Sequence, residues 1–169
     1  KVIWKKEIPG KFKNAEWNAG ADIEWLPETD TFLIVAPKKG FFEINRKGKV
    51  LNSCENKYIS HDLDKLDDGS FIFVNGWDLK GEKNPIITKV TNDCKISMSK
   101  SEDFFGMDKA DLNPKYAMDM ANMHSNSIRI LKDESIMLSV RNYDQVIVFK
   151  NNKIIKRFKN ATGVHDPSE

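Results

Sequence analysis

The chain has 169 residues, of which 27 are Lys or Arg and 25 are Asp or Glu, so its formal net charge is only +2. The lysines are scattered along the chain, whereas a nucleic-acid-binding domain usually concentrates its positive charge in one stripe. No apolar run approaches the roughly 18 residues that cross a bilayer, so the sequence predicts neither nucleic-acid binding nor a membrane span.

Three segments of the chain repeat one pattern of strands and turns. The first copy begins at Ala21, the second at His61 and the third at His124. Each copy has a short strand that ends in a leucine, then an acidic turn, and then a run of β-forming residues. Continuous apolar runs of this length between turn residues are typical of strands buried on both faces. These runs are Phe32–Val35, Phe71–Val74 and Ile136–Leu138.

A third and a fourth strand follow in each copy. The predicted third strands are Gly40–Ile44, Pro85–Val90 and Gln145–Phe149. The predicted fourth strands are Lys49–Leu51, Lys95–Met98 and Lys153–Ile155. Four strands in each copy, at a spacing near 40 residues, are typical of the blades of a β-propeller.

The sequence therefore predicts an all-β fold, a β-propeller of four-stranded blades of which about three lie in this chain. An all-β sandwich is the alternative, but it would not explain why strands and turns repeat in register. The whole chain, 1–169, is interpreted as one partial propeller domain. Its blades are expected over residues 21–55, 61–98 and 124–158.

The flanks and one insertion extend this pattern. Residues 2–6 resemble the last strand of a preceding blade, and residues 165–169 resemble the start of a following one. Residues 99–122 are an insertion in the second copy, expected to be a loop that projects from one face. Three blades do not close a ring, and an open ring exposes sheet edges. Further blades or a second chain are therefore expected to complete the ring, and six blades would make this chain half of it.

The chain has two cysteines, Cys54 and Cys94, and neither has a Cys or His neighbour at the spacing of metal ligands. No metal site is predicted. A disulfide between them is expected in an oxidising compartment, and two free thiols are the alternative. The sequence leaves this choice open.

All three histidines stand at the start of a copy, as His61, His124 and His165. In a propeller the first strand of each blade lies nearest the central axis, so these positions are expected to converge at one mouth of the channel. Arg141 follows the second strand of the third copy, and its planar fork of donors suits sulfate or phosphate oxygens. The alternatives are that the histidines cap strands or tie blades together, and that Arg141 forms a surface ion pair with Asp144.

The segment His124–Phe149 resembles the core motif of the bacterial and archaeal arylsulfotransferases that use a donor ester instead of a nucleotide sulfate. His61–Val74 resembles the His-Asp blade opening of the same family. Gly163–Glu169 resembles the segment around the family's nucleophilic histidine, although Val164 stands where members often have Gln. The resemblance covers most of Ala21–Glu169.

The resemblance implies a six-bladed propeller, exported to the periplasm or the cell surface, that needs no cofactor. It would transfer a sulfuryl group from a phenolic sulfate donor to a phenol acceptor. His165 would be the nucleophile that carries the group as sulfohistidine. His61, His124 and Arg141 would bind the sulfuryl oxygens and assist the leaving phenol. The alternative function is a non-catalytic exported propeller that binds a ligand or partner or serves as a structural module.

Overall fold

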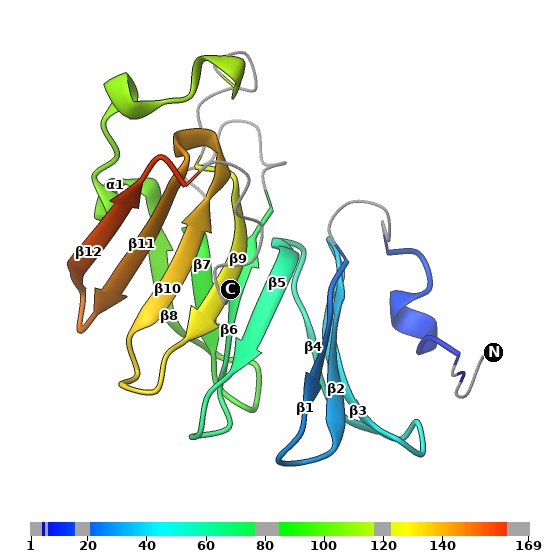
Figure 1. Ribbon diagram of the computed structural model, residues 1–169. Coiled ribbons are helices and arrows are strands. Elements are labelled where there is room, and N and C mark those ends of the chain that lie inside the picture. Colours follow the sequence, from blue (N-terminus) through cyan, green and yellow to red (C-terminus); the bar gives the residue numbers. More distant parts are fainter. Residues whose placement is uncertain (1–4, 6, 16–20, 77–84, 117–122, 162–169) are drawn as a thin grey trace.

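The computed structural model of the protein describes residues 5, 7–15, 21–76, 85–116 and 123–161. Twelve strands in this part of the chain form three four-stranded antiparallel sheets that stand side by side (Figure 1). Each sheet is an up-and-down meander whose strands follow one another in chain order. No helix in the described part is both long enough and apolar enough to cross a membrane.

Each sheet coincides with one of the sequence repeats, so the predicted all-β fold of four-stranded units is confirmed. The first sheet contains β1 (Ile23–Leu26), β2 (Thr31–Ala36), β3 (Gly40–Asn45) and β4 (Val50–Glu55). The second contains β5 (Ile59–Lys65), β6 (Phe71–Asn75), β7 (Pro85–Val90) and β8 (Ile96–Ser101). The third contains β9 (Ser125–Ile130), β10 (Ile136–Val140), β11 (Gln145–Lys150) and β12 (Lys153–Lys159).

The fourth strand of every sheet is longer than the sequence predicts. β4 ends at Glu55, β8 at Ser101 and β12 at Lys159, each several residues beyond the expected end. These outer strands are largely exposed, and the residues beyond the expected ends are mostly polar. They therefore lack the apolar run that marks a buried strand in the sequence.

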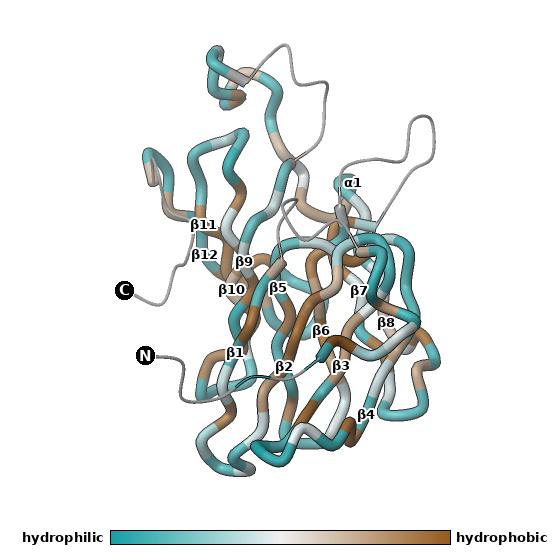
Figure 2. Tube along the Cα trace, turned by 90° about the vertical axis from the view of Figure 1, so that its right-hand side faces the viewer, coloured by the Kyte–Doolittle hydropathy of each residue, from teal (hydrophilic) through white to brown (hydrophobic). Residues whose placement is uncertain are grey.

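The core lies between the sheets, and β6 is buried on both of its faces. Phe71 and Phe73 pack toward the first sheet, in a cluster that includes Phe41. Ile72 and Val74 pack toward the third sheet. Figure 2 shows this arrangement as hydrophobic stretches along the middle strands of the sheets, with hydrophilic turns at their ends. Non-directional burial of apolar side chains between the sheets is therefore the main force that holds the blades together.

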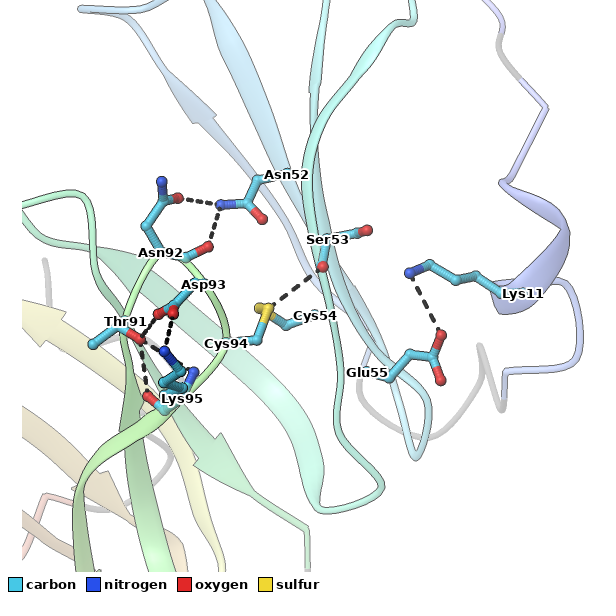
Figure 3. The surroundings of a disulfide bond; sticks show 10 residues. All are labelled: Lys11, Asn52, Ser53, Cys54, Glu55, Thr91, Asn92, Asp93, Cys94 and Lys95. Carbon is cyan, nitrogen blue, oxygen red and sulfur yellow. Dashed lines mark hydrogen bonds and ion pairs between the residues drawn. A yellow bond between two sulfur atoms is a disulfide. The ribbon is translucent and has the colours of Figure 1, made fainter.

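A disulfide joins the first two sheets at their outer side (Figure 3). It links Cys54 in β4 to Cys94 in the β7–β8 turn, with Cα atoms 5.6 Å apart. Beside it, the Asn52 side-chain amide donates to the backbone oxygen of Asn92 at 3.3 Å. The choice between a disulfide and two free thiols, which the sequence leaves open, is thus decided in favour of the disulfide.

Residues 7–15 cover the face of the first sheet that points away from the second (Figure 1). The short helix η1 (Gly10–Phe12) places the fully buried ring of Phe12 against Phe42, with ring centroids 5.0 Å apart. On the same sheet Ile23 and Trp25 stay 65% and 52% exposed. The segment therefore covers only part of this apolar face.

The insertion predicted over residues 99–122 starts within the second sheet. Its first residues belong to β8, and the short helices α1 (Glu102–Phe105), η2 (Lys109–Asp111) and η3 (Pro114–Tyr116) follow. Phe105 is fully buried and meets the ring of Phe149 edge-on at 5.7 Å, so the start of the insertion is part of the core. Residues 117–122 lie outside the described part of the chain, as do residues 165–169 and, apart from residue 5, the predicted strand 2–6.

Candidate functional site

His61 and His124 lie side by side, at the end of the sheets where β5 and β9 begin. His61 is the third residue of β5, and His124 directly precedes β9. Their ring centroids are 5.4 Å apart, with the planes inclined by 38°. They are 63 residues apart in the sequence (124 minus 61). Packing of the third blade against the second therefore brings two equivalent positions of the repeat into contact.

The backbone is irregular at both histidines. His61 has a φ of +59° and His124 a φ of +43°, in the left-handed region that few non-glycine residues adopt. Between Ile59 and Leu63, β5 advances four residues while β6 advances two, and β9 has a similar irregularity opposite Val140. Bulges of this kind re-aim side chains. They explain why the two rings meet although their strands belong to different sheets.

Arg141 completes this cluster, which we call the histidine–arginine cluster: His61, His124 and Arg141. Arg141 starts the short helix η4 (Arg141–Tyr143) directly after β10, at the predicted place. Its Nη1 atom lies 3.2 Å from His124 Nε2, and its backbone N–H donates to the His124 carbonyl oxygen at 3.1 Å. A guanidinium only donates, so His124 Nε2 accepts in this contact and the ring carries its proton on Nδ1. His165 lies outside the described residues.

A second group of charged side chains, which was not predicted from the sequence, follows the histidine–arginine cluster along the inner strands. Glu24 in β1, Asp64 in β5 and Arg129 in β9 occupy equivalent positions of the three sheets. Arg129 Nη1 donates to Glu24 Oε1 at 2.7 Å. The signal was present, because the first two copies open with acidic residues at the same two places, in ADIE and HDLD.

Two carboxylates of β5 accept hydrogen bonds from the backbone of β9. Asp62 Oδ2 accepts from the N–H of Ile128, and Asp64 Oδ2 accepts from the N–H of Ile130, both at 2.8 Å. These contacts join the second blade to the third at the inner edge. A carboxylate that replaces a missing strand partner keeps the buried N–H groups satisfied.

The carboxyl groups of Asp62, Glu24 and Asp64 on the inner strands have raised pKa values. Burial raises the pKa of Asp62 to about 7, although the Ile128 N–H favours the ionised form. Burial, and next the charge of Asp64, raise the pKa of Glu24 to about 7 in spite of Arg129. Burial also raises the pKa of Asp64. Near neutral pH Asp62 and Glu24 are therefore only partly ionised.

Metal binding finds no support in the described ranges, where no group of three or more His, Cys, Asp or Glu side chains is arranged to hold an ion. A groove of about 470 Å³ lies between the first two sheets, at the opposite end of β5 from His61. Its wall includes Glu43, whose carboxylate binds Lys65 at 2.9 Å and Thr31 at 2.8 Å. These polar groups satisfy one another within the protein.

No protein-family model matches the chain, and no curated protein matches it. Among solved structures, a protein of unknown function from Bacteroides caccae superposes with a TM-score of 0.55 at 14% identity, over 85% of this chain and 48% of its own. Hsv2 from Kluyveromyces lactis superposes with a TM-score of 0.54 at 14% identity, over 83% of this chain and 37% of its own. The fold is a β-propeller.

A third propeller, a catalytically inactive variant of virginiamycin B lyase from Staphylococcus aureus with quinupristin, superposes with a TM-score of 0.50 at 16% identity. It is matched over 85% of this chain and 42% of its own. The chain thus spans less than half the length of these structures. At such identities the likeness establishes the fold alone. In a propeller the first strand of each blade is innermost, so the histidine–arginine cluster lies at one end of the inner strands.

Proposed function

We propose that the protein is an arylsulfotransferase-like propeller that moves a sulfuryl group from a phenolic sulfate ester to a phenol. The observation that supports this proposal is the contact of Arg141 with His124, beside His61, at one end of the inner strands. The oxygens of a transferring sulfuryl group gather negative charge, which preorganised donors stabilise in the transition state. A guanidinium fork supplies such donors in a fixed plane.

In the proposed first step, a ring nitrogen of His165 attacks the sulfur atom and forms an N–S bond. The bond from sulfur to the phenol oxygen breaks, and the phenolate keeps the electron pair and takes a proton from the imidazolium form of His61. His124, whose Nε2 accepts from Arg141 and which is therefore neutral, would bind a sulfuryl oxygen through its Nδ1–H. In the second step an acceptor phenol attacks the sulfur and passes its proton back to His61. The N–S bond then breaks and returns its electron pair to the His165 ring. The role of His165 rests on the sequence resemblance of residues 163–169.

The carboxyl groups next to the cluster are compatible with an anionic donor. Ionised carboxylates along the inner strands would repel a sulfate ester, whereas Glu24 and Asp62 have pKa values raised to about 7. Arg129 further compensates the charge of Glu24 through its ion pair. The field that an approaching sulfate meets is therefore less negative than the residue types alone indicate.

We also propose that the protein is exported, to the periplasm or the cell surface. The Cys54–Cys94 disulfide supports this location, because disulfides persist in oxidising compartments. The three sheets do not close a ring by themselves, and further blades or a second chain would complete it.

A non-catalytic propeller that binds a ligand or serves as a structural module is the second candidate. A backbone hydrogen bond favours this candidate: the N–H of Arg141 donates to the carbonyl oxygen of His124 and so joins η4 to the start of β9. The Asp62 contact with Ile128 ties the second blade to the third in the same region. On this reading the polar residues of the inner strands join blades.

The two candidates are separated by incubating the protein with 4-nitrophenyl sulfate and phenol. Catalysis predicts release of 4-nitrophenol with ping-pong kinetics, and a sulfo-adduct on His165 by mass spectrometry when donor is present alone. His165→Asn should abolish turnover. Arg141→Lys keeps the charge but loses the fork, so it should lower the rate by about 10²-fold. Arg46→Lys, which alters an exposed ion pair with Asp30, is the matched control and should leave the rate unchanged.

Absence of the adduct, together with a His165→Asn variant that behaves like the parent, would identify a binding or structural module. An adduct on another residue would move the nucleophile and disprove the assignment to His165.

A further inference from the structure

The insertion contacts the turn that carries Arg141. The backbone N–H of Asn113 donates to the Asn142 carbonyl oxygen at 2.9 Å. The side-chain amide of Asn113 donates to Asp144 Oδ2, and its Oδ1 accepts from the N–H of Lys115 at 2.9 Å. Asn113 therefore binds the η4 turn through both its backbone and its side-chain amide. Its side-chain oxygen makes a local hydrogen bond within the insertion.

The turn that Asn113 binds is short and needs outside support. η4 has three residues, and Asp144 closes it with a left-handed φ of +46°. A 3₁₀ turn of this length has few hydrogen bonds of its own. Tyr143 is 6% exposed and packs in the same core cluster as Phe105 of the insertion. The insertion thus binds Asn142 and Asp144 and shares a core cluster with Tyr143, and these are the three residues that follow Arg141.

The insertion is itself anchored to the third sheet. Asp111 Oδ2 accepts from Lys159 Nζ at 2.7 Å and from the Gln145 side-chain amide at 3.3 Å. Arg157 donates to the carbonyl oxygen of Phe105. In Figure 1 this segment rises from the end of β8 and lies beyond the ends of β11 and β12. The insertion is therefore bound both to the third sheet and to η4.

We propose that Asn113 is a positioning residue that holds η4 so that the Arg141 guanidinium stays against His124. This inference rests on the proposed function, in which that guanidinium receives the sulfuryl oxygens. The side-chain bond from Asn113 to Asp144 fixes the end of η4, and the backbone bond from Arg141 to His124 fixes its start. Because both ends of η4 are held, the backbone at Arg141 is fixed and the orientation of its side chain is restricted. Anion recognition requires this kind of preorganisation.

A swap of the hydrogen-bonding pair tests the proposal in the whole protein. Asn113→Asp removes the donor and sets a second carboxylate against Asp144. Adding Asp144→Asn restores one donor and one acceptor with reversed polarity, and Asn tolerates the left-handed backbone there. Lys109→Gln is the matched control, because it lowers the net charge of the same insertion by one, as Asn113→Asp does, at an exposed position of η2.

The first readout is the dissociation constant for inorganic sulfate, followed by NMR through the His61 and His124 ring signals. We expect Asn113→Asp to weaken sulfate binding by about tenfold, the effect of losing roughly one charge-assisted hydrogen bond. The double variant should return to within about twofold of the parent, and Lys109→Gln should match the parent. A lower melting temperature with unchanged sulfate affinity would overturn the proposal, because it would show a purely structural role.

The second readout needs no ligand and so separates this inference from the proposed function. In sulfate-free buffer, Asn113→Asp should move the His124 ring signals toward those of Arg141→Ala, and the double variant should move them back. A parent protein that binds no sulfate but shows this shift and recovery would refute the proposed function and support the positioning role. His124 signals that stay at the parent position in Asn113→Asp would refute the positioning role, whatever the affinity for sulfate.

Discussion

Replacing Cys94 by Asn should lower the free energy of unfolding by about 4 kcal/mol. The disulfide closes a loop over a sequence separation of 40 residues. In the chain-entropy description this restricts the unfolded state by about 13 cal/mol/K, which is about 4 kcal/mol at 25 °C. Cys94 is the better partner to change because it is exposed and has a φ of +66°, which Asn adopts readily. Cys54 is 2% exposed and packs in the core, so it is left in place.

Urea unfolding, followed by tryptophan fluorescence and far-ultraviolet circular dichroism, measures this loss. The oxidised parent should unfold in one transition at higher urea than the variant, and the parent in reducing buffer should coincide with the variant. The variant itself should not respond to reductant. If thiol titration shows an intact disulfide in the parent and the variant still unfolds within about 1 kcal/mol of it, the reasoning is refuted. Apolar packing between the blades would then already restrict the unfolded chain as much as the cross-link does.

Two further predictions concern the backbone and the inner carboxyl groups. Gly40→Ala should lower the free energy of unfolding by more than about 3 kcal/mol, because a Cβ there would lie 1.9 Å from the Cys54 carbonyl oxygen. Gly69→Ala meets nothing within 4 Å and should lower it by only roughly 1–2 kcal/mol. Equal losses of stability in thermal unfolding would contradict this close approach. The Asp62 pKa is raised from 3.8 to about 7, so the unfolded state ionises first and stability of the parent should fall as pH rises through that window. Asp62→Asn keeps an acceptor for the Ile128 N–H but does not titrate. In urea unfolding, the stability of this variant relative to the parent should therefore increase from pH 4 to pH 7. A difference that stays constant with pH would contradict the raised pKa of Asp62.

The repeat in the sequence was sufficient to predict the sheets, because buried strands such as Phe71–Val74 carry an apolar run that surface strands lack. It also predicted that His61 and His124 converge, since both open a copy of the repeat. The convergence of these two rings is confirmed by their separation of 5.4 Å. The convergence of His165 stays a prediction.

The sequence left open, or did not indicate, the contacts that depend on how the blades and the insertion pack. Arg141, which contacts His124, begins a short turn whose end is bound by Asn113, a residue distant in the sequence. The Cys54–Cys94 disulfide requires the distance between two neighbouring sheets, which no local pattern contains. Asp62 was interpreted only as part of a blade opening, because its role follows from the backbone of β9 beside it.

The bonds from Asp62 and Asp64 to Ile128 and Ile130 have a consequence for how one blade is staggered against the next. Donor and acceptor residues are both spaced by two, the period of a strand, so the two N–H groups point to the same edge of β9. Sliding the blades by one residue would set the carboxylates against carbonyl oxygens, so these two side chains select a single stagger. They also occupy the N–H groups that a foreign strand would need for pairing, and so protect the innermost edge against aggregation.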